Sequence, residues 1–131
     1  MSKRMRSVVF TAPSIVSVEE AELPHPAGDE LLIKTERSAI SAGSELLFYR
    51  GQAPADLAAD ATISALVEQA GTYPLRYGYA CAGTVLAAGD EGNAGQVGQR
   101  IFAFHPHASH FVVKANDVIP VPQDVTTERA A

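Results

Sequence analysis

The segment Cys81-Ala-Gly-Thr-Val-Leu-Ala-Ala88 decides the fold class, because it is a run of small apolar residues in the second half of the chain. A short continuous apolar run of this kind is typical of a buried β-strand. Gly83 lies inside the run, and a glycine within a strand indicates close approach by another backbone or by a ligand. The sequence therefore predicts a buried strand at residues 81–88.

Shorter runs on both sides continue this pattern. Apolar and polar residues alternate in six further stretches, which predicts strands at residues 7–10, 15–20, 30–37, 100–104, 110–114 and 118–121. The first two are separated by Thr-Ala-Pro-Ser, which is a turn signal. Seven short strands with Gly- and Pro-rich breaks predict a mainly β fold, a barrel or a sandwich.

Two helices are expected in the middle of the chain. Residues 44–50 can form a short helix, with Ser41 or Ser44 as the N-cap and Gly51 as the terminating residue. Residues 62–70 place apolar side chains at the i, i+3, i+4, i+7 spacing of an amphipathic helix. We expect both helices to turn their apolar faces toward the core.

The last ten residues look like the beginning of a third helix. Thr126 is a candidate N-cap, and Glu128 and Arg129 would lie in the first turn. A helix that ends at Ala131 is too short to be stable alone. We therefore expect the natural polypeptide to continue beyond this residue.

Composition limits what the protein can be. A chain of 131 residues that is 47% apolar forms one globular domain, and a net charge of −5 is too small to favour disorder. The acidic balance argues against nucleic acid as a partner, and no apolar run reaches the roughly 18 residues of a membrane span. The single cysteine, Cys81, has no internal disulfide partner, so we expect a cytoplasmic protein with a reduced thiol.

Three segments could carry chemistry, and the first is Ser41-Ala-Gly-Ser-Glu45. A helix that begins here offers free backbone N–H groups, which suit an anion or a polarised carbonyl. Ser44 could relay a proton and Glu45 could orient it. The alternative is that Ser44 only caps the helix and Glu45 complements its dipole.

The second segment contains Tyr77 and Tyr79, and the third contains three histidines. A tyrosine hydroxyl can donate a proton or bind an oxyanion, although such pairs are more often packing residues. His105, His107 and His110 could ligate a metal. In an extended strand, however, His105 and His107 share a face while His110 lies on the other. We therefore expect these histidines to line a cleft as hydrogen-bond donors or packing residues.

Four segments together carry a family resemblance. They are Ala39-Ile-Ser-Ala-Gly-Ser-Glu45, Gly78-Tyr-Ala-Cys-Ala-Gly83, Val97-Gly-Gln-Arg-Ile101 and Ile119-Pro-Val-Pro-Gln-Asp-Val-Thr126. In this order and spacing the chain resembles the N-terminal GroES-like catalytic domain of the medium-chain dehydrogenase/reductase superfamily over nearly its whole length. The resemblance implies a partly open β-barrel with one or two short helices at residues 1–131. It also implies a Rossmann domain that is absent from this chain.

Within that superfamily the chain resembles the branch that contains bacteriochlorophyllide dehydrogenase. The resemblance rests on residues 38–45, on Ala58-Ala-Asp-Ala-Thr-Ile63, on Tyr73-Pro-Leu-Arg-Tyr-Gly-Tyr79 and on Phe102-Ala-Phe-His-Pro-His107. Zinc-dependent members of the superfamily hold their metal with a loop cysteine and a strand-entry histidine. Ala42 and Tyr79 stand at the matching positions, and neither is a competent zinc ligand.

The resemblance implies the substrate-binding half of a zinc-independent NAD(P)-dependent oxidoreductase that acts on an alcohol, ketone or enone. Ser44, Tyr79, His105 and His107 are then the candidate catalytic residues, and Gly43, Ser44 and Glu45 the candidate cofactor contacts. We expect the isolated domain to be inactive and to bind NAD or NADP barely, because the missing domain holds most of the dinucleotide. Its expected partners are a small-molecule substrate and its own Rossmann domain, with no nucleic acid or membrane and with a homo-oligomer left open. The alternative is a stand-alone GroES-like module for interaction or assembly.

Overall fold

The computed structural model describes residues 3–52 and 73–131. The helix expected at residues 62–70 and the branch segment that ends at Ile63 lie outside this part of the chain. Among the described residues, no helix has the length and apolar character needed to cross a membrane.

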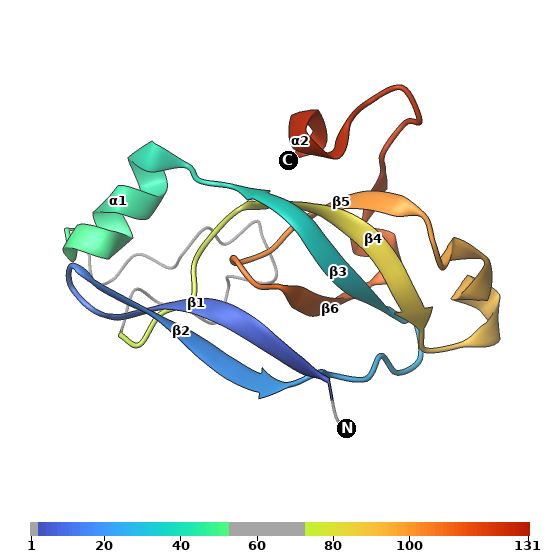
Figure 1. Cartoon of the computed structure of the whole chain (residues 1–131), viewed down its shortest axis with the longest axis horizontal. Coiled ribbons are helices and arrows are strands. Elements are labelled where there is room, and N and C mark those ends of the chain that lie inside the picture. Colours follow the sequence, from blue (N-terminus) through green and yellow to red (C-terminus); the bar gives the residue numbers. More distant parts are fainter. Residues whose placement is uncertain (1–2, 53–72) are drawn as a thin grey trace.

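The described strands form two antiparallel sheets (Figure 1). The first is a hairpin of β1 (Arg4–Ala12) and β2 (Ile15–Glu22). The second has the order β6-β3-β4-β5-β7, and its members in chain order are β3 (Glu30–Ala39), β4 (Ala80–Ala88), β5 (Arg100–Phe104), β6 (His110–Lys114) and β7 (Ile119–Pro120). This mainly β arrangement, with short helices and no closed barrel, confirms the predicted fold class.

β4 lies at the centre of the larger sheet, between β3 and β5. Its Cys81 and Val85 side chains are buried. A Cβ atom at Gly83 would lie 2.1 Å from the carbonyl oxygen of Lys34 on β3, so a side chain there would push the two strands apart. The approach by another backbone that the sequence indicated at this glycine is therefore confirmed.

The apolar side chains gather in two clusters. The larger lies in the five-stranded sheet and contains Leu31, Ile33, Cys81, Val85, Ile101, Ala103 and Phe111. The smaller joins the hairpin to the first helix and contains Phe10, Phe48, Leu75 and Tyr77. The smaller cluster therefore fixes the hairpin against α1. An isolated bridge between Ser7 and Ala108 also joins β1 to the segment before β6.

Helix α1 (Ala42–Arg50) begins two residues earlier than its apolar pattern predicted. Ser41 is the N-cap residue, so the alternative that Ser44 caps the helix is wrong. The Ser41 side chain makes no capping hydrogen bond, and the Glu45 carboxylate instead accepts from the Ser41 N–H. Gly51 ends the helix with φ +71°, a left-handed conformation that favours glycine and confirms the predicted stop.

The remaining elements are short. η2 (Glu91–Gln96) forms the turn before β5, and η3 (Ala115–Asp117) follows β6. α2 (Thr127–Ala130) has the predicted cap, since Thr126 Oγ1 accepts a hydrogen bond from the Arg129 N–H at 3.2 Å. α2 lies beside β3 and β4 of the larger sheet, and Arg37 of β3 pairs with Glu128 at 3.4 Å.

Candidate functional site

The polar centre of the molecule is a buried pair between Glu45 of α1 and His107, which follows β5. Nε2 of His107 bonds one carboxylate oxygen of Glu45, and both side chains are nine-tenths or more buried. The second carboxylate oxygen accepts from the backbone N–H of Ser41. On the other edge of the imidazole, Nδ1 lies 2.8 Å from Ser38 Oγ at the end of β3. Three elements far apart in sequence therefore meet in one hydrogen-bond network, the Ser38–His107–Glu45 cluster.

The partners of His107 fix one hydrogen atom of its ring. A carboxylate only accepts hydrogen bonds, so the hydrogen toward Glu45 is on Nε2 of His107. In the neutral imidazole Nδ1 then carries a lone pair, and Ser38 donates its hydroxyl hydrogen to it. The cluster places three groups in sequence: a hydroxyl, an imidazole that can take its proton, and a carboxylate that orients the imidazole. Enzyme sites that transfer protons use the same sequence of groups.

The sequence makes room for this imidazole at a glycine. A Cβ atom at Gly78 would lie 2.9 Å from the His107 ring and 3.0 Å from its backbone nitrogen. The His107 carbonyl also accepts a hydrogen bond from Val8 N–H of β1 at 3.1 Å. The hairpin therefore fixes the backbone of His107, and the segment before β4 packs against its ring.

Cys81 is buried close to the same cluster. Burial raises the pKa of its thiol to about 12, and the nearby negative charge of Glu45 adds to the rise. Its Sγ points toward the backbone carbonyl oxygens of His105 and Pro106 at 3.5 and 3.8 Å. At neutral pH the residue is a thiol without nucleophilic character, which agrees with the reduced, buried cysteine that the sequence predicted.

A cavity of about 380 Å³ opens beside the Ser38–His107–Glu45 cluster. All three cluster residues line it. The rest of its wall is apolar or aromatic and comes from the hairpin, the end of β3 and α1: Val8, Phe10, Val16, Ile40, Leu46 and Tyr49. We call it the Ser38 cavity.

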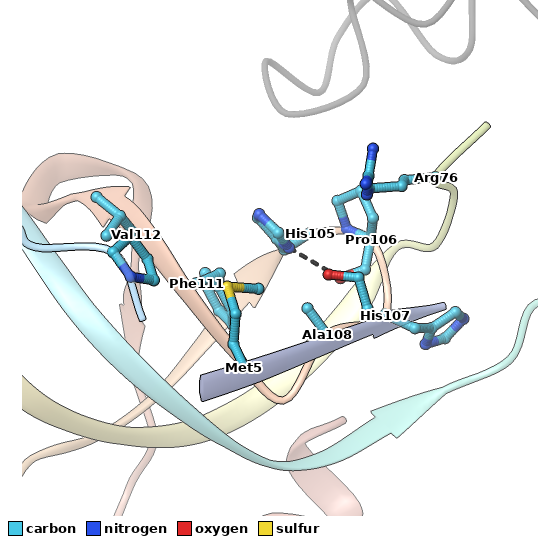
Figure 2. Close-up of a pocket in the computed structure, with 10 residues that line it drawn as sticks. Met5, Arg76, His105, Pro106, His107, Ala108, Phe111 and Val112 are labelled. Atoms are coloured by element: carbon cyan, nitrogen blue, oxygen red, sulfur yellow. Dashed lines mark hydrogen bonds between the residues drawn. The ribbon is translucent and has the colours of Figure 1, made fainter. Parts of the chain in front are cut away.

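A second cavity of similar volume shares His107 with the Ser38 cavity, and Figure 2 shows it. His105 lines it and stacks on Phe111, with ring centroids 4.2 Å apart. Its Nδ1 donates to the carbonyl oxygen of Pro106 at 2.8 Å. Burial lowers the pKa of His105, and the bond to Pro106 opposes that shift. We call this the His105 cavity.

The three histidines do not act as one group. The His105 and His107 rings point away from each other in Figure 2, so the shared face of an extended strand does not occur here. Both residues line the His105 cavity, which confirms for these two the expectation that the histidines line a cleft. The reason is that β5 ends at Phe104 and the backbone turns through Pro106, so strand alternation no longer applies. His110 pairs instead with Ser109 Oγ, 3.0 Å from its Nδ1. Within residues 3–52 and 73–131 no group of three His, Cys, Asp or Glu side chains could hold a metal ion.

The other predicted residues lie around the start of α1 and the entry to β4. Gly43 and Ser44 occupy the first turn of α1, where Gly43 is exposed and Ser44 half-buried. Tyr79 is half-buried, and its hydroxyl shares a hydrogen bond with that of Tyr77. Neither Ser44 nor Tyr79 lines the Ser38 cavity or the His105 cavity. Their predicted roles stay predictions.

Zinc of the superfamily's catalytic type does not suit the residues at its matching positions. Ala42 is an exposed first residue of α1, and its methyl group has no donor atom. Tyr79 offers a neutral phenol that already bonds Tyr77. The side chains at these two positions therefore do not fit a catalytic zinc ion.

Sequence reasoning missed Ser38. It follows the strand predicted at residues 30–37 and enters the prediction only as part of residues 38–45, which carry the resemblance to the bacteriochlorophyllide dehydrogenase branch. A serine at the end of a strand that feeds a helix N-terminus was the only available signal, because such a position places a hydroxyl near the free N–H groups of the helix.

Comparison with known proteins finds a relative by sequence and several solved structures with a similar fold. No protein-family model matches the chain. It is 32% identical over 100 residues to 2-desacetyl-2-hydroxyethyl bacteriochlorophyllide A dehydrogenase from Cereibacter sphaeroides, a match that covers 76% of this chain and 27% of that protein. An alcohol dehydrogenase superfamily protein from Novosphingobium aromaticivorans has a TM-score of 0.74 at 22% identity, over 96% of this chain and 37% of the other. A short chain alcohol dehydrogenase from E. coli CFT073, complexed with NADH, has a TM-score of 0.73 at 20% identity, over 97% and 41%.

Fold and sequence together define a GroES-like domain of the medium-chain dehydrogenase/reductase superfamily, and the chain belongs to that superfamily. Within it, the chain is similar to the bacteriochlorophyllide dehydrogenase of Cereibacter sphaeroides. The chain spans between a quarter and about two fifths of the length of the three proteins named above.

Proposed function

We propose that this chain is the substrate-side domain of an NAD(P)-dependent oxidoreductase that transfers hydride to or from an alcohol, ketone or enone without catalytic zinc. The observation that carries the proposal is the match of 76% of the chain to a curated dehydrogenase. The fold shared with an NADH-bound dehydrogenase supports it. The Ser38–His107–Glu45 cluster supplies groups of the kind that such a reaction needs beside a cavity.

The dinucleotide would supply or accept the hydride, and a Rossmann domain outside this chain would hold most of it. This chain's contribution would come from the start of α1. The first turn of a helix has free backbone N–H groups and a positive dipole end, so Gly43 and Ser44 could bind a polar group of the cofactor there. Both oxygens of Glu45 are engaged by Ser41 and His107, so its part would be to hold the loop in place.

Two further residues would act on the substrate oxygen in this proposal. The Tyr79 hydroxyl would stabilise the developing oxyanion, and its bond to Tyr77 would hold it in position. Ser44 would relay a proton from the first turn of α1. Ala42 and Tyr79 have no zinc-binding chemistry, which supports an organic hydrogen-bonding mechanism for this branch.

The test uses the polypeptide in which this domain is joined to a dinucleotide-binding domain. Tyr79→Phe should lower kcat by about 10- to 1,000-fold if its hydroxyl stabilises the oxyanion, in the range measured for one lost oxyanion donor. Tyr73→Phe is the matched control, because the Tyr73 hydroxyl bonds the carbonyl of Phe48 in the helix. Turnover and substrate affinity at wild-type levels in Tyr79→Phe would contradict the role.

A second experiment addresses zinc and the isolated chain. Activity of the joined protein should survive dialysis against a chelator and should not rise when zinc is added back. Calorimetry with the 131-residue chain alone should detect no micromolar binding of NADPH. Loss of activity with the chelator, restored by zinc, would reject the zinc-independent mechanism.

A further inference from the structure

The Ser38 cavity has the composition of a small-molecule site. Its walls are apolar or aromatic, and three of its polar residues belong to one network. The remaining polar group, the Tyr49 hydroxyl, already donates to the carbonyl oxygen of Ser14 at 3.2 Å. Binding sites for small molecules commonly combine an apolar lining with a few convergent polar groups, and about 380 Å³ lies in their usual size range. A ligand of this cavity would therefore be mainly apolar, with its polar atom directed at the cluster.

We propose that the Ser38 cavity binds an apolar molecule through a single hydroxyl group, with Ser38 as the contact and the His107–Glu45 pair as the acceptor of its proton. In this inference Ser38 takes the contact to the substrate oxygen and the proton relay that the proposed function gives to Tyr79 and Ser44. The Ser38→Ala and Tyr79→Phe variants decide between the two placements. The claim that the bound hydroxyl compound is the substrate rests on the proposed function. The claim that the cavity binds such a compound rests only on the geometry of the cavity.

The hydrogen-bond inventory selects Ser38 as the contact. Both oxygens of Glu45 already accept bonds, and both ring nitrogens of His107 are engaged. Ser38 is an exposed residue, and its hydroxyl lies 2.8 Å from Nδ1 of His107. With a neutral imidazole the hydroxyl gives its one hydrogen to Nδ1, which leaves oxygen lone pairs as its means of binding. A lone pair binds a donor, so with neutral His107 the cavity favours a hydroxyl group over a carbonyl or an ether.

The same inventory gives a balanced proton path for oxidation of the bound alcohol. A dinucleotide bound beside the cavity would accept the hydrogen of the carbon with both electrons as hydride. The alcohol oxygen would lose its proton to Ser38 as the C=O bond forms. Ser38 passes its own hydrogen to Nδ1 of His107, which becomes an imidazolium opposite the Glu45 carboxylate. Ser38 then carries a hydrogen that it can donate to the ketone oxygen. Reduction follows the same steps in reverse.

The experiment measures ligand binding to the 131-residue chain by NMR titration, with 1-phenylethanol as the probe. Ethylbenzene lacks the hydroxyl and acetophenone replaces it with a carbonyl. We expect 1-phenylethanol to shift resonances of Val16, Leu46 and Tyr49 and to bind more tightly than either analogue. Ser38→Ala should weaken its binding about fivefold to tenfold, since one hydrogen bond is lost, and should leave ethylbenzene binding unchanged.

Ser109→Ala is the matched control, because Ser109 also bonds a histidine but does not line the cavity. It should leave the affinity for 1-phenylethanol unchanged. Equal affinity of wild type and Ser38→Ala, or shifts confined to Met5 and Val112 of the His105 cavity, would overturn the inference. The binding assay contains no dinucleotide, so it tests the cavity separately from hydride transfer. If the 131-residue chain binds 1-phenylethanol but the protein joined to a dinucleotide-binding domain transfers no hydride, only the proposed function is rejected.

The role of His107 has its own readout. Upon binding of 1-phenylethanol, the ¹⁵N shift of Nδ1 should change, because the Ser38 hydroxyl that bonds it gains a second partner. Ethylbenzene should not change it. A histidine with only a structural role would give the same Nδ1 shift with both probes, and that result would remove the relay from the inference.

Discussion

His105 and His107 are separated by one proline and have opposite surroundings. His105 stacks on Phe111 and donates to a backbone carbonyl. His107 is bonded on both ring nitrogens, to a buried carboxylate and to a hydroxyl, although both histidines line the His105 cavity. The difference teaches that identical side chains in a short motif can serve packing and polar chemistry at once, according to the partners that each ring meets.

The largest predicted effect is the loss of stability when the His107–Glu45 pair is broken. Glu45→Leu leaves the His107 ring buried without its acceptor and removes the partner of the Ser41 N–H. Breaking one member of a buried pair costs about 3 to 5 kcal/mol, so urea unfolding should show a loss of this size. Glu19→Gln breaks the exposed pair with Arg76 and should cost less than about 1 kcal/mol. Similar losses in the two variants would contradict the comparison.

Replacing each histidine by phenylalanine separates the two environments. His105→Phe keeps a ring that can stack on Phe111 and loses one hydrogen bond, so it should change stability by about 1 kcal/mol. His107→Phe leaves Glu45 buried and unpaired, and should cost about 3 kcal/mol or more. In the double variant with Glu45→Leu the loss should be smaller than the sum of the two single losses. Additive losses would show that the pair is not formed.

The smallest predicted effect is the contribution of His105 to the pH dependence of stability. Burial holds the pKa of His105 below its usual 6.5. Below pH 6.5 the unfolded chain therefore binds a proton that the folded chain does not, and stability falls as the pH falls through this window. The contribution of His105 is fully present above pH 6.5.

His105→Gln should make this fall less steep, by at most about 1.4 kcal/mol per pH unit, in urea unfolding between pH 7 and 5. The pKa of His110 is also lowered, by burial and then by Lys34 and Lys3, so the His105→Gln variant keeps some slope from that residue. An unchanged slope in His105→Gln would show that its imidazole titrates normally.

Local patterns determined most of the fold in advance. The bounds of β5 and β6 agree with the alternation of their residues, because each strand has one face on the core. Gly51 and Gly83 were also predictable, since a left-handed φ and a close backbone approach both need glycine. The start of α1 was placed too late because its first residues, Ala42 and Gly43, carry no apolar signal.

The site could be predicted only in part. Glu45 and His107 were both candidates, but their pairing joins residues 62 positions apart and depends on how the strands assemble. Ser38 was missed because its function comes from the ring that it meets and not from its neighbours in sequence. The shared face expected for His105 and His107 failed where the strand ended.

One ¹⁵N-edited NMR spectrum of the imidazole rings tests the central claim, that the two histidines belong to opposite environments. The structure predicts that His105 carries its hydrogen on Nδ1, toward Pro106, and that His107 carries one on Nε2, toward Glu45. Shifts that place a hydrogen on Nδ1 alone in both rings, or rings that average between tautomers, would contradict the account.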